Sequence, residues 1–306
     1  MTTLVTGGAG FIGSHLVRRI VASGERVRVV DDLSTGSVAR LTTVQEQIEF
    51  AQIDLATADL TSVVAGIDAV YHLAAIPSVP RSVRDPLPTN SSIVIGTLRL
   101  LIAATKAGAS RFVHSSSSSV YGDTEISPKT ENLPPRPLSP YAVAKLAAEG
   151  YVRVWSSIYG LPTVTLRYFN VFGPGQDPAS QYAAVIPRFI TAALRGDSVA
   201  VFGDGKQTRD FTYVENVVDA NVRARSASVS GCIYNIAAGE PHSVLELVTS
   251  LERVLQRPIG VRHEATRPGD ILHSHADITS AERDLGWRPA VAFEEGLRRT
   301  VEWFAT

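Results

Sequence analysis

Strand-length apolar segments alternate with helix-length amphipathic segments through the first half of the chain. Short runs rich in β-branched residues, such as 2–7, 26–31 and 48–54, flank longer segments with a helical period, such as 11–24. Strands joined through helices run parallel and carry helices on both faces, so this alternation predicts βαβ units. The same alternation continues over 68–75, 92–108, 111–116, 139–160 and 162–170. The sequence therefore predicts an α/β fold with a doubly wound parallel sheet.

The alternation loosens after about residue 170. The segment 173–187 combines glycine, proline and polar residues, and the elements that follow it are shorter. Glycine and proline in such density indicate an irregular connection. We therefore expect a first domain over residues 1–170 and a smaller α/β lobe, mainly over residues 171–306. We also expect the two to be partly interleaved, with a segment at about 204–230 returning to the first domain.

Composition and charge exclude several classes of function. The 306 residues carry a formal net charge of −1, and the basic residues are dispersed, so we expect neither nucleic acid nor a membrane surface as a partner. No apolar stretch in the sequence approaches the length of about 18 residues that spans a bilayer. The first residues lack a basic segment followed by an apolar one, so we expect no signal peptide and a cytoplasmic protein. Cys232 stands alone and no residues have metal-ligand spacing, so we expect no disulfide and no metal.

The segment VTGGAGFIGSH (5–15) places three glycines between a predicted strand and a predicted helix. Gly7, Gly10 and Gly13 allow a tight turn, a close approach of backbone to a pyrophosphate, and close packing of the helix on the sheet. The helix N-terminus then offers N–H groups to the phosphates. Such a triplet is also typical of an ordinary glycine-rich turn. Asp31, 18 residues after Gly13 at the end of the next strand, favours a dinucleotide because its carboxylate can accept both ribose hydroxyls.

Asp31 also bears on the identity of the dinucleotide. A carboxylate there repels a ribose 2′-phosphate, so NAD is favoured over NADP. Asp32 either contacts the ribose or stays solvated in the loop, and Asp54 either meets the adenine edge or caps a helix. The other expected cofactor contacts are Phe11, Ile12, Leu33, Leu55, Leu73, Ala74 and Ala75.

Five consecutive serines (115–119) end the strand predicted at 111–116. They lie at the carboxyl edge of the sheet, where doubly wound folds bind ligands. In the next predicted helix, Tyr141 and Lys145 are four residues apart and share one face. We expect the Lys145 ammonium and a nicotinamide ring to lower the pKa of Tyr141 from its usual value of about 10, so that it can take a proton from a substrate hydroxyl. Ser117 is expected to hydrogen-bond the same oxygen.

A tyrosine–lysine pair at this spacing is by itself typical of a solvated helix face. Together with the glycine turn and the serine run it indicates a catalytic site, and the chain then resembles the extended short-chain dehydrogenase/reductase superfamily. The resemblance is to the nucleotide-sugar epimerase/dehydratase branch and covers nearly the whole chain. The segments that carry it are TGGAGFIGSH, DLSTG, HLAA, SSSSSVYGD, SPYAVAK, LRYFNVFGPGQDP, GDGKQTRDFTYVENVV and RPGDILHSHAD.

The resemblance implies a Rossmann-like NAD-binding domain and a lobe that closes over a nucleoside-diphosphate sugar. It also implies a homodimer that forms through helices near 92–107 and 140–159. In relatives that dehydrate or decarboxylate their substrate, acidic residues stand just before the VYG segment. Ser118 and Ser119 occupy those positions here. The remaining set of Ser117, Tyr141 and Lys145 suffices for reversible oxidation at one carbon.

The resemblance therefore implies a UDP-sugar 4-epimerase with Tyr141 as the base and a transient 4-keto sugar. NAD would stay tightly bound and be regenerated in each cycle. Asn170, Arg209 and Arg267 would bind the sugar diphosphate, since guanidinium groups pair bidentately with phosphate oxygens. Ser274 matches the position that gates the sugar pocket, where a small residue leaves room for an N-acetyl group. The other implied substrate contacts are Ser78, Ser117, Ser118, Ala184, Val185, Val201, Phe202 and Asp270.

Several alternatives stay open at this point. UDP-glucose and UDP-galactose rank first, the N-acetylated pair second, and UDP-glucuronate third because Gly175 stands where uronate-specific relatives carry an arginine. A nucleotide-sugar dehydratase or reductase is a further alternative, and so is a regulatory protein that binds NAD without catalysis. The chain also departs from the family pattern at Ile93, where relatives carry an asparagine, although Asn90 lies one turn earlier.

Overall fold

A parallel sheet lies at the centre of the larger part of the molecule. The computed structural model describes residues 1–178, 184–266 and 272–306. The strands of the large sheet are β1 (Thr2–Thr6), β2 (Arg26–Asp31), β3 (Ile48–Gln52), β4 (Ala69–His72), β5 (Arg111–Ser117), β6 (Thr163–Tyr168) and β11 (Cys232–Ile236). Their order is β11-β6-β5-β4-β1-β2-β3, and all neighbouring pairs are parallel. The predicted doubly wound α/β fold is thus confirmed. The order reverses between β1 and β4, which opens a crevice at their carboxyl ends.

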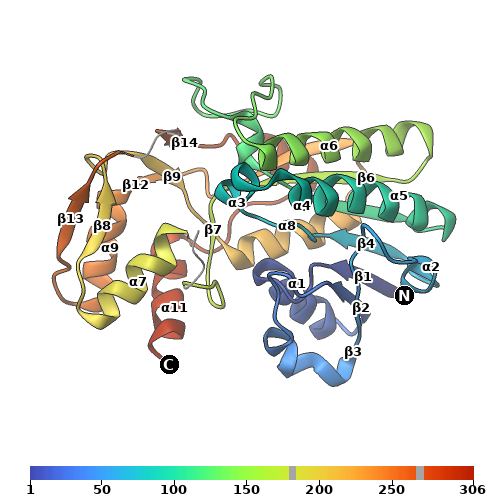
Figure 1. The fold of residues 1–306 in the computed structure, drawn as a ribbon, viewed down its shortest axis with the longest axis horizontal. Coiled ribbons are helices and arrows are strands. Elements are labelled where there is room, and N and C mark those ends of the chain that lie inside the picture. The colour runs from blue at the N-terminus through green and yellow to red at the C-terminus, as the bar shows by residue number, and fades with distance from the viewer. Residues whose placement is uncertain (179–183, 267–271) are drawn as a thin grey trace.

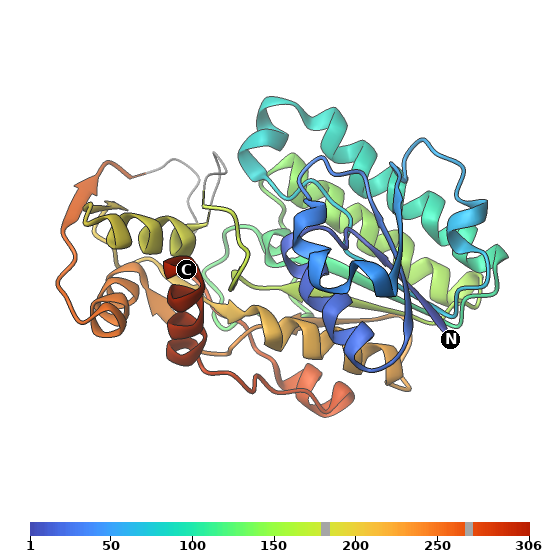
Figure 2. The same cartoon turned by 90° about the horizontal axis from the view of Figure 1, so that it is seen from below.

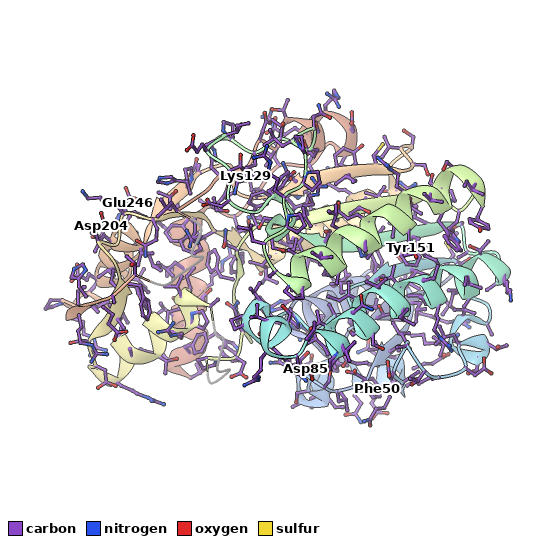
Figure 3. The ribbon with its side chains drawn as sticks, turned by 45° about the horizontal axis from the view of Figure 1, so that its top comes forward. Phe50, Asp85, Lys129, Tyr151, Asp204 and Glu246 are labelled. Carbon is purple, nitrogen blue, oxygen red and sulfur yellow. The ribbon has the colours of Figure 1, made fainter. Side chains whose placement is uncertain are left out.

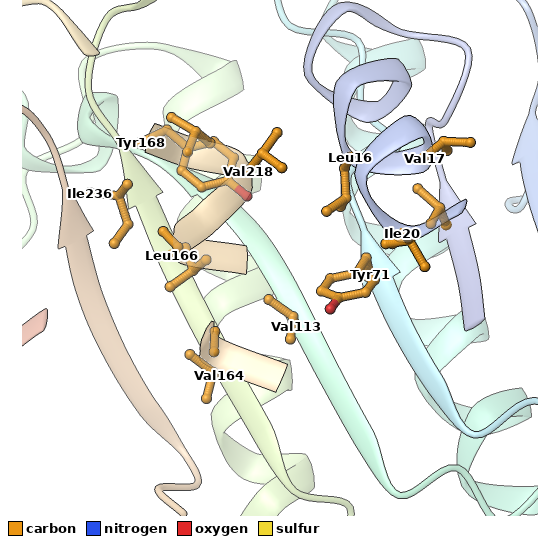
Figure 4. Close-up of a cluster of buried hydrophobic side chains, with 14 of the residues drawn as sticks. Leu16, Val17, Ile20, Tyr71, Val113, Val164, Leu166, Tyr168, Val218 and Ile236 are labelled. Carbon is orange, nitrogen blue, oxygen red and sulfur yellow. The ribbon is translucent and has the colours of Figure 1, made fainter. Parts of the chain in front are cut away.

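Helices cover both faces of this sheet (Figures 1 and 2). One face carries α1 (Phe11–Ala22) and α8 (Val214–Ser226); the other carries α2 (Thr61–Val64), α5 (Gly96–Lys106) and α6 (Pro140–Ile158). Successive strand residues point to opposite faces, so in β1 Leu4 packs with α5 and α6 while Val5 packs with α1 and α8. Figure 4 shows Leu16, Val17 and Ile20 of α1 beside Tyr71 and Val113 of the sheet.

The helix that precedes β5 in the chain is longer than the sequence pattern predicts. It begins at α4 (Pro86–Asn90), continues through a π-helical turn, η2 (Ser91–Ile95), and ends with α5. The pattern predicts a start at residue 92, but prolines are well accommodated in a first helical turn, where backbone N–H groups have no partner in the helix. The whole helix, Pro86–Lys106, has 21 residues and is long and apolar enough to cross a membrane by length and composition alone.

The expectation that no segment reaches this length is therefore wrong. The helix nevertheless belongs to the core of the fold, because Leu100, Leu101 and Ala104 are fully buried against the sheet. Ile93 is buried against α6.

The smaller lobe lies at the left of Figure 1. Its helices α7 (Val185–Arg195), α9 (Val244–Leu255) and α11 (Phe293–Ala305) bury an apolar core that includes Phe189, Leu247 and Leu297. Two small sheets complete it, β13-β8 and β12-β9-β14. Their strands are β8 (Val199–Phe202), β9 (Thr208–Asp210), β12 (Pro241–Ser243), β13 (Val261–Glu264) and β14 (His273–Ser274).

The two parts are interleaved along the chain. After β7 (Val171–Phe172) and the small-lobe elements, the chain pairs β10 (Thr212–Tyr213) with β7 and returns to the large sheet through α8 and β11. The Arg111 guanidinium of β5 donates to the carbonyls of Ala224 and Val229, which fixes this return. The returning segment thus runs from 214 to 236, later than the stretch of about 204–230 expected from the sequence. The remaining elements are α3 (Val79–Arg84), α10 (Thr279–Leu285), η1 (Val38–Gln47) and η3 (Ser118–Tyr121).

The packing of the glycine turn predicts the effect of a single methyl group. A Cβ at Gly13 would lie 2.1 Å from the Gly7 carbonyl oxygen, so Gly13→Ala forces the turn apart. We expect a loss of about 2–3 kcal/mol in the free energy of unfolding, measured by urea denaturation. Gly150→Ala in α6 is the matched control, because a Cβ there has no neighbour within 4 Å and alanine favours a helix by about 1 kcal/mol. Equal stability of the two variants would contradict this packing.

Candidate active site

A cleft of about 1230 Å³ runs along the carboxyl edge of the large sheet toward the small lobe. Residues that follow β1, β2, β4, β5 and β6 line it, together with α3 and the start of α6. The sequence-predicted residues on its wall are Gly7, Gly10, Phe11, Ile12, Gly13, Asp31, Asp32, Asp54, Leu55, Leu73, Ala74, Ala75, Ser78, Ser117, Ser118, Tyr141, Lys145, Asn170, Ala184, Arg209 and Ser274. One continuous space thus joins the predicted cofactor and substrate positions.

The glycine turn presents the N-terminus of α1 to this cleft. Gly7 has a φ of 71°, and a Cβ there would lie 2.7 Å from the Ala74 backbone nitrogen, so the turn passes directly against the segment that follows β4. No side chain caps α1 at Gly10 in the described structure, which leaves its first N–H groups available to an anion. The cradle therefore fits a pyrophosphate.

Asp31 lies at the end of β2, beside this turn. Its carboxylate oxygens accept hydrogen bonds from the backbone N–H groups of Ala9 (3.0 Å) and Leu33 (2.9 Å). Burial raises the pKa of Asp31, while these two hydrogen bonds oppose the rise. A carboxylate has about four lone-pair sites, so the fixed group can still accept ribose hydroxyls.

The neighbouring acids have local roles as well. Asp32 is exposed and accepts hydrogen bonds from the backbone and hydroxyl of Ser34, as expected for a solvated loop residue. Asp54 accepts hydrogen bonds from the Ala56 backbone and the Thr57 hydroxyl, and it still lines the cleft. The turn-stabilising role and a position facing the cleft therefore coexist at Asp54.

The tyrosine and the lysine project from the first turns of α6. Ser139 caps this helix by accepting a hydrogen bond from the Ala142 N–H (3.2 Å), and Pro140 occupies its first position. The Tyr141 N–H donates to the Ser82 hydroxyl of α3 (3.1 Å), and Lys145 Nζ donates to the Ser115 carbonyl of β5 (2.8 Å). These bonds fix the helix start against the strand that carries the serines.

The acid–base properties of the pair differ from the expectation. Burial raises the pKa of Tyr141, and a hydrogen bond with Ser117 opposes that rise. Burial also lowers the pKa of Lys145 to about 8, which Glu149 opposes. The direction is therefore opposite to the expected lowering of the Tyr141 pKa, because burial is the largest influence on this group. The Ser117 contact is the interaction that favours the phenolate.

The predicted sugar-binding residues meet where the two lobes join. Asn170 Nδ2 donates to the Ser274 hydroxyl (3.3 Å) and to the Asp210 carbonyl (3.2 Å). Asn170 has a φ of 32°, a conformation that asparagine tolerates better than most residues. Arg209 lines the same end of the cleft and donates to the Thr208 carbonyl. A small hydroxyl residue, Ser274, therefore lines the cleft beside Asn170.

Four other predicted contacts are not among the described residues that line this cleft. Val201 is fully buried in the small-lobe core, Val185 packs against that core, and Phe202 does not line the cleft. A strand pattern does not tell which face of β8 points inward, and here the core takes Val201. Leu33 packs against the core beneath α1 and also lies off the cleft wall.

Arg267, Asp270 and Asn90 are the remaining residues named from the sequence. Arg267 and Asp270 lie outside the described residues. Asn90 is exposed and is not among the residues that line the cleft. No group of three or more His, Cys, Asp or Glu side chains that could hold a metal ion occurs within residues 1–178, 184–266 and 272–306.

The sequence reasoning missed several groups. Arg40, which donates to the Gly175 and Ala9 carbonyls, lines the cleft near Asp31, and Arg81 and Gln176 also lie on the wall. Arg40 lies in η1, Arg81 in α3 and Gln176 in the irregular segment after β7, and the periodicity of the sequence predicts neither of these two short helices. Glu149 was also missed, although it follows Lys145 by one helical turn, a spacing that could have revealed it.

Comparisons with known proteins agree with this site. Residues 3–237 match the model of the NAD dependent epimerase/dehydratase family. The UDP-glucose 4-epimerase of Mycolicibacterium smegmatis is 42% identical over 99% of this chain and 98% of its own length. Among solved structures, the UDP-N-acetylglucosamine 4-epimerase of Methanobrevibacter ruminantium, in complex with UDP-N-acetylmuramic acid, is 41% identical, with a TM-score of 0.96 and coverage of 99% and 98% of the two chains.

A third relative carries the cofactor. The UDP-glucuronic acid 4-epimerase of Bacillus cereus, solved with UDP-glucuronic acid and NAD, is 34% identical, with a TM-score of 0.91 over 100% of this chain and 99% of that one. The family model matches more than half of the chain, and the epimerases named above are similar to it over nearly its full length. The chain therefore belongs to the NAD dependent epimerase/dehydratase family.

Proposed function

We propose that this protein is a UDP-sugar 4-epimerase that interconverts UDP-glucose and UDP-galactose. The observation that carries the proposal is the wall of the cleft at the end of β5. Ser117, Tyr141 and Lys145 line it together, and the neighbouring positions Ser118 and Ser119 supply hydroxyls instead of carboxylates. Elimination of water from the sugar needs an additional general acid, and no acidic side chain occupies either position.

Each residue of the site has a distinct role in this reaction. Tyr141 accepts the proton of the sugar 4-hydroxyl, and Ser117, hydrogen-bonded to Tyr141, steadies the same oxygen. Lys145, held on the Ser115 carbonyl, keeps a positive charge beside the phenolate. The glycine turn and Asp31 would hold NAD, which when bound supplies a reversible hydride acceptor for C4. Because a 4-epimerase restores its cofactor in each cycle, NAD is expected to stay bound.

The small residue at the sugar end of the cleft favours a second substrate pair. Ser274 lines the cleft and is hydrogen-bonded to Asn170, and its short side chain occupies less of the cleft than a larger one would. UDP-N-acetylglucosamine and UDP-N-acetylgalactosamine are therefore proposed as additional substrates. The relative from Methanobrevibacter ruminantium, named for UDP-N-acetylglucosamine, supports this extension.

Turnover without added cofactor tests the proposed reaction. The purified protein is incubated separately with UDP-glucose, UDP-N-acetylglucosamine and UDP-glucuronate, and the anomeric protons are followed by NMR. We expect a galacto-configured product of unchanged mass from the first two sugars. A product that has lost water, or one that forms only with added NADH, would instead indicate a dehydratase or a reductase.

Removal of the Tyr141 hydroxyl separates chemistry from cofactor binding. Tyr141→Phe deletes the proposed base, so kcat should fall by at least about 100-fold while NAD released on denaturation stays at the wild-type amount. Tyr151→Phe is the control, since Tyr151 lies on the same helix with 38% of its surface exposed (Figure 3). Retained activity in Tyr141→Phe would refute the assignment of the base.

A bulky residue at position 274 should change which sugars the cleft accepts. Ser274→Tyr fills the space proposed for the N-acetyl group. We expect kcat/KM for UDP-N-acetylglucosamine to fall by more than about 100-fold, while the value for UDP-glucose changes by less than about tenfold. Parallel losses for both sugars would show that Ser274 does not control the choice.

The outer faces of α5 and α6 support the expected homodimer. Large apolar side chains on these faces have more than a third of their surface exposed. They are Ile102, Val143, Tyr151, Val154 and Ile158. Apolar surface gathered on adjacent helices is typical of an interface. We therefore propose that two copies associate through α5 and α6.

A charge at this face should disrupt the dimer. Val154→Arg places a guanidinium in the proposed interface, and light scattering should show the mass of a monomer. Val261→Arg on β13 is the control, because Val261 is exposed to a similar extent, 38% against 40% for Val154. If both variants keep the same mass as the unmodified protein, the interface lies elsewhere.

A further inference from the structure

Glu149 extends the catalytic face of α6 by one turn. Tyr141, Lys145 and Glu149 follow one another at intervals of four residues, so they lie along one side of the helix, facing the sheet. The Glu149 side chain is 2% exposed. Carboxylates are almost never this deeply buried unless they are paired, so its partners require explanation.

Three hydrogen bonds fix the Glu149 carboxylate between β5 and β6. Oε1 accepts from the Ser116 hydroxyl (2.5 Å) and from Arg167 Nε (2.8 Å), and Oε2 accepts from Arg167 Nη2 (2.6 Å). The Arg167 guanidinium is itself buried and stacks over the Tyr121 ring at 4.7 Å. This bidentate geometry fixes the position of the Glu149 carboxylate.

The surroundings of Lys145 contain few charges that could stabilise its ammonium. From α6, Tyr141 and Glu149 face it. From the sheet, His72 of β4 and His114 of β5 lie nearby, and β5 also supplies the Ser115 carbonyl, while Arg167 of β6 pairs with Glu149. Burial lowers the pKa of His72 to about 3 and that of His114 well below its usual value, so both rings are neutral. Among these described groups, Glu149 is the only carboxylate, so it is the group that can favour the ammonium form of Lys145.

We propose that Glu149 is a positioning residue that keeps Lys145 protonated, with Ser116 and Arg167 holding its carboxylate one helical turn from the ammonium. The inference rests on the proposed function, because it concerns the same Tyr141–Lys145 pair. Deletion of a carboxylate near a buried ammonium favours the neutral amine. The structure agrees with this direction, since Glu149 opposes the burial that lowers the pKa of Lys145.

The sign of the pH effect follows from the charge that the reaction needs. An ammonium is present below its pKa and is lost as the pH rises through that value. If Glu149 is neutralised, the pKa of Lys145 falls below about 8, so activity should disappear at a lower pH. At acidic pH, where Lys145 is protonated in either case, the activity should return toward that of the wild type.

The test uses Glu149→Gln, which keeps the shape of the side chain and removes its charge. Because this change leaves the buried Arg167 unpaired, the double variant Glu149→Gln/Arg167→Met, which removes both charges, is studied beside it. For each folded variant, kcat is measured against pH with UDP-glucose. We expect the alkaline limb to move down by about 1–3 pH units, with at least about tenfold lower kcat at pH 8 and recovery near pH 6.

A second readout does not depend on catalysis. The chain has four lysines, Lys106, Lys129, Lys145 and Lys206, so selective ¹³C labelling gives few signals, and Lys145→Arg identifies the one from Lys145. A titration of the purified protein with its bound cofactor should show a lower pKa for Lys145 in the Glu149 variants, with the signal of exposed Lys206 as an internal reference.

The two readouts separate the possible failures. An unchanged Lys145 titration in the Glu149 variants would overturn the inference even if the enzyme epimerises its substrate. A shifted Lys145 titration in a protein that converts no UDP-sugar would uphold the role of Glu149 and refute the proposed function. A uniform fall in kcat at every pH, with an unchanged titration, would show that Glu149 is only structural.

Discussion

The hydrogen bond from Lys145 to the Ser115 carbonyl joins the two elements on which the site depends. It ties the first turns of α6 to the carboxyl end of β5, so the tyrosine and the serines lie on one wall of the cleft. On the same helix, Ala144 and Ala148 are almost completely buried and pack against Ile93 of η2. The reversal of strand order between β1 and β4 then places the nucleotide-binding turn beside the same wall.

The small lobe depends on a second buried group. Asp210 accepts hydrogen bonds from the backbone N–H groups of Ala238, Gly239 and Ala276, so one carboxylate holds the loop after β11 and the segment that follows Ser274. Burial raises the pKa of Asp210 to about 6, and the hydrogen bonds oppose this rise. Arg209, next to Asp210 in the chain, and Ser274, which pairs with Arg209 between β9 and β14, both line the cleft.

Much of this arrangement could be predicted from the sequence because it follows from short-range periodicity. The glycine spacing, the position of Asp31 at the end of a strand and the four-residue interval between Tyr141 and Lys145 are all local patterns. Contacts between distant segments were not accessible in this way. The pairing of Glu149 with Arg167 joins a helix to a strand, and no pattern in either segment indicates it. The burial of Val201 likewise depends on which face of β8 meets the small-lobe core.

The most direct test of the proposed reaction follows the hydrogen atom at C4 of the sugar. UDP-glucose carrying deuterium at C4 is incubated with the protein in the absence of added cofactor, and the product is examined by NMR and mass spectrometry. The proposed epimerisation predicts UDP-galactose of unchanged mass that retains the deuterium at C4. Deuterium found at C6 of a product that has lost water, or washed out into the solvent, would contradict it.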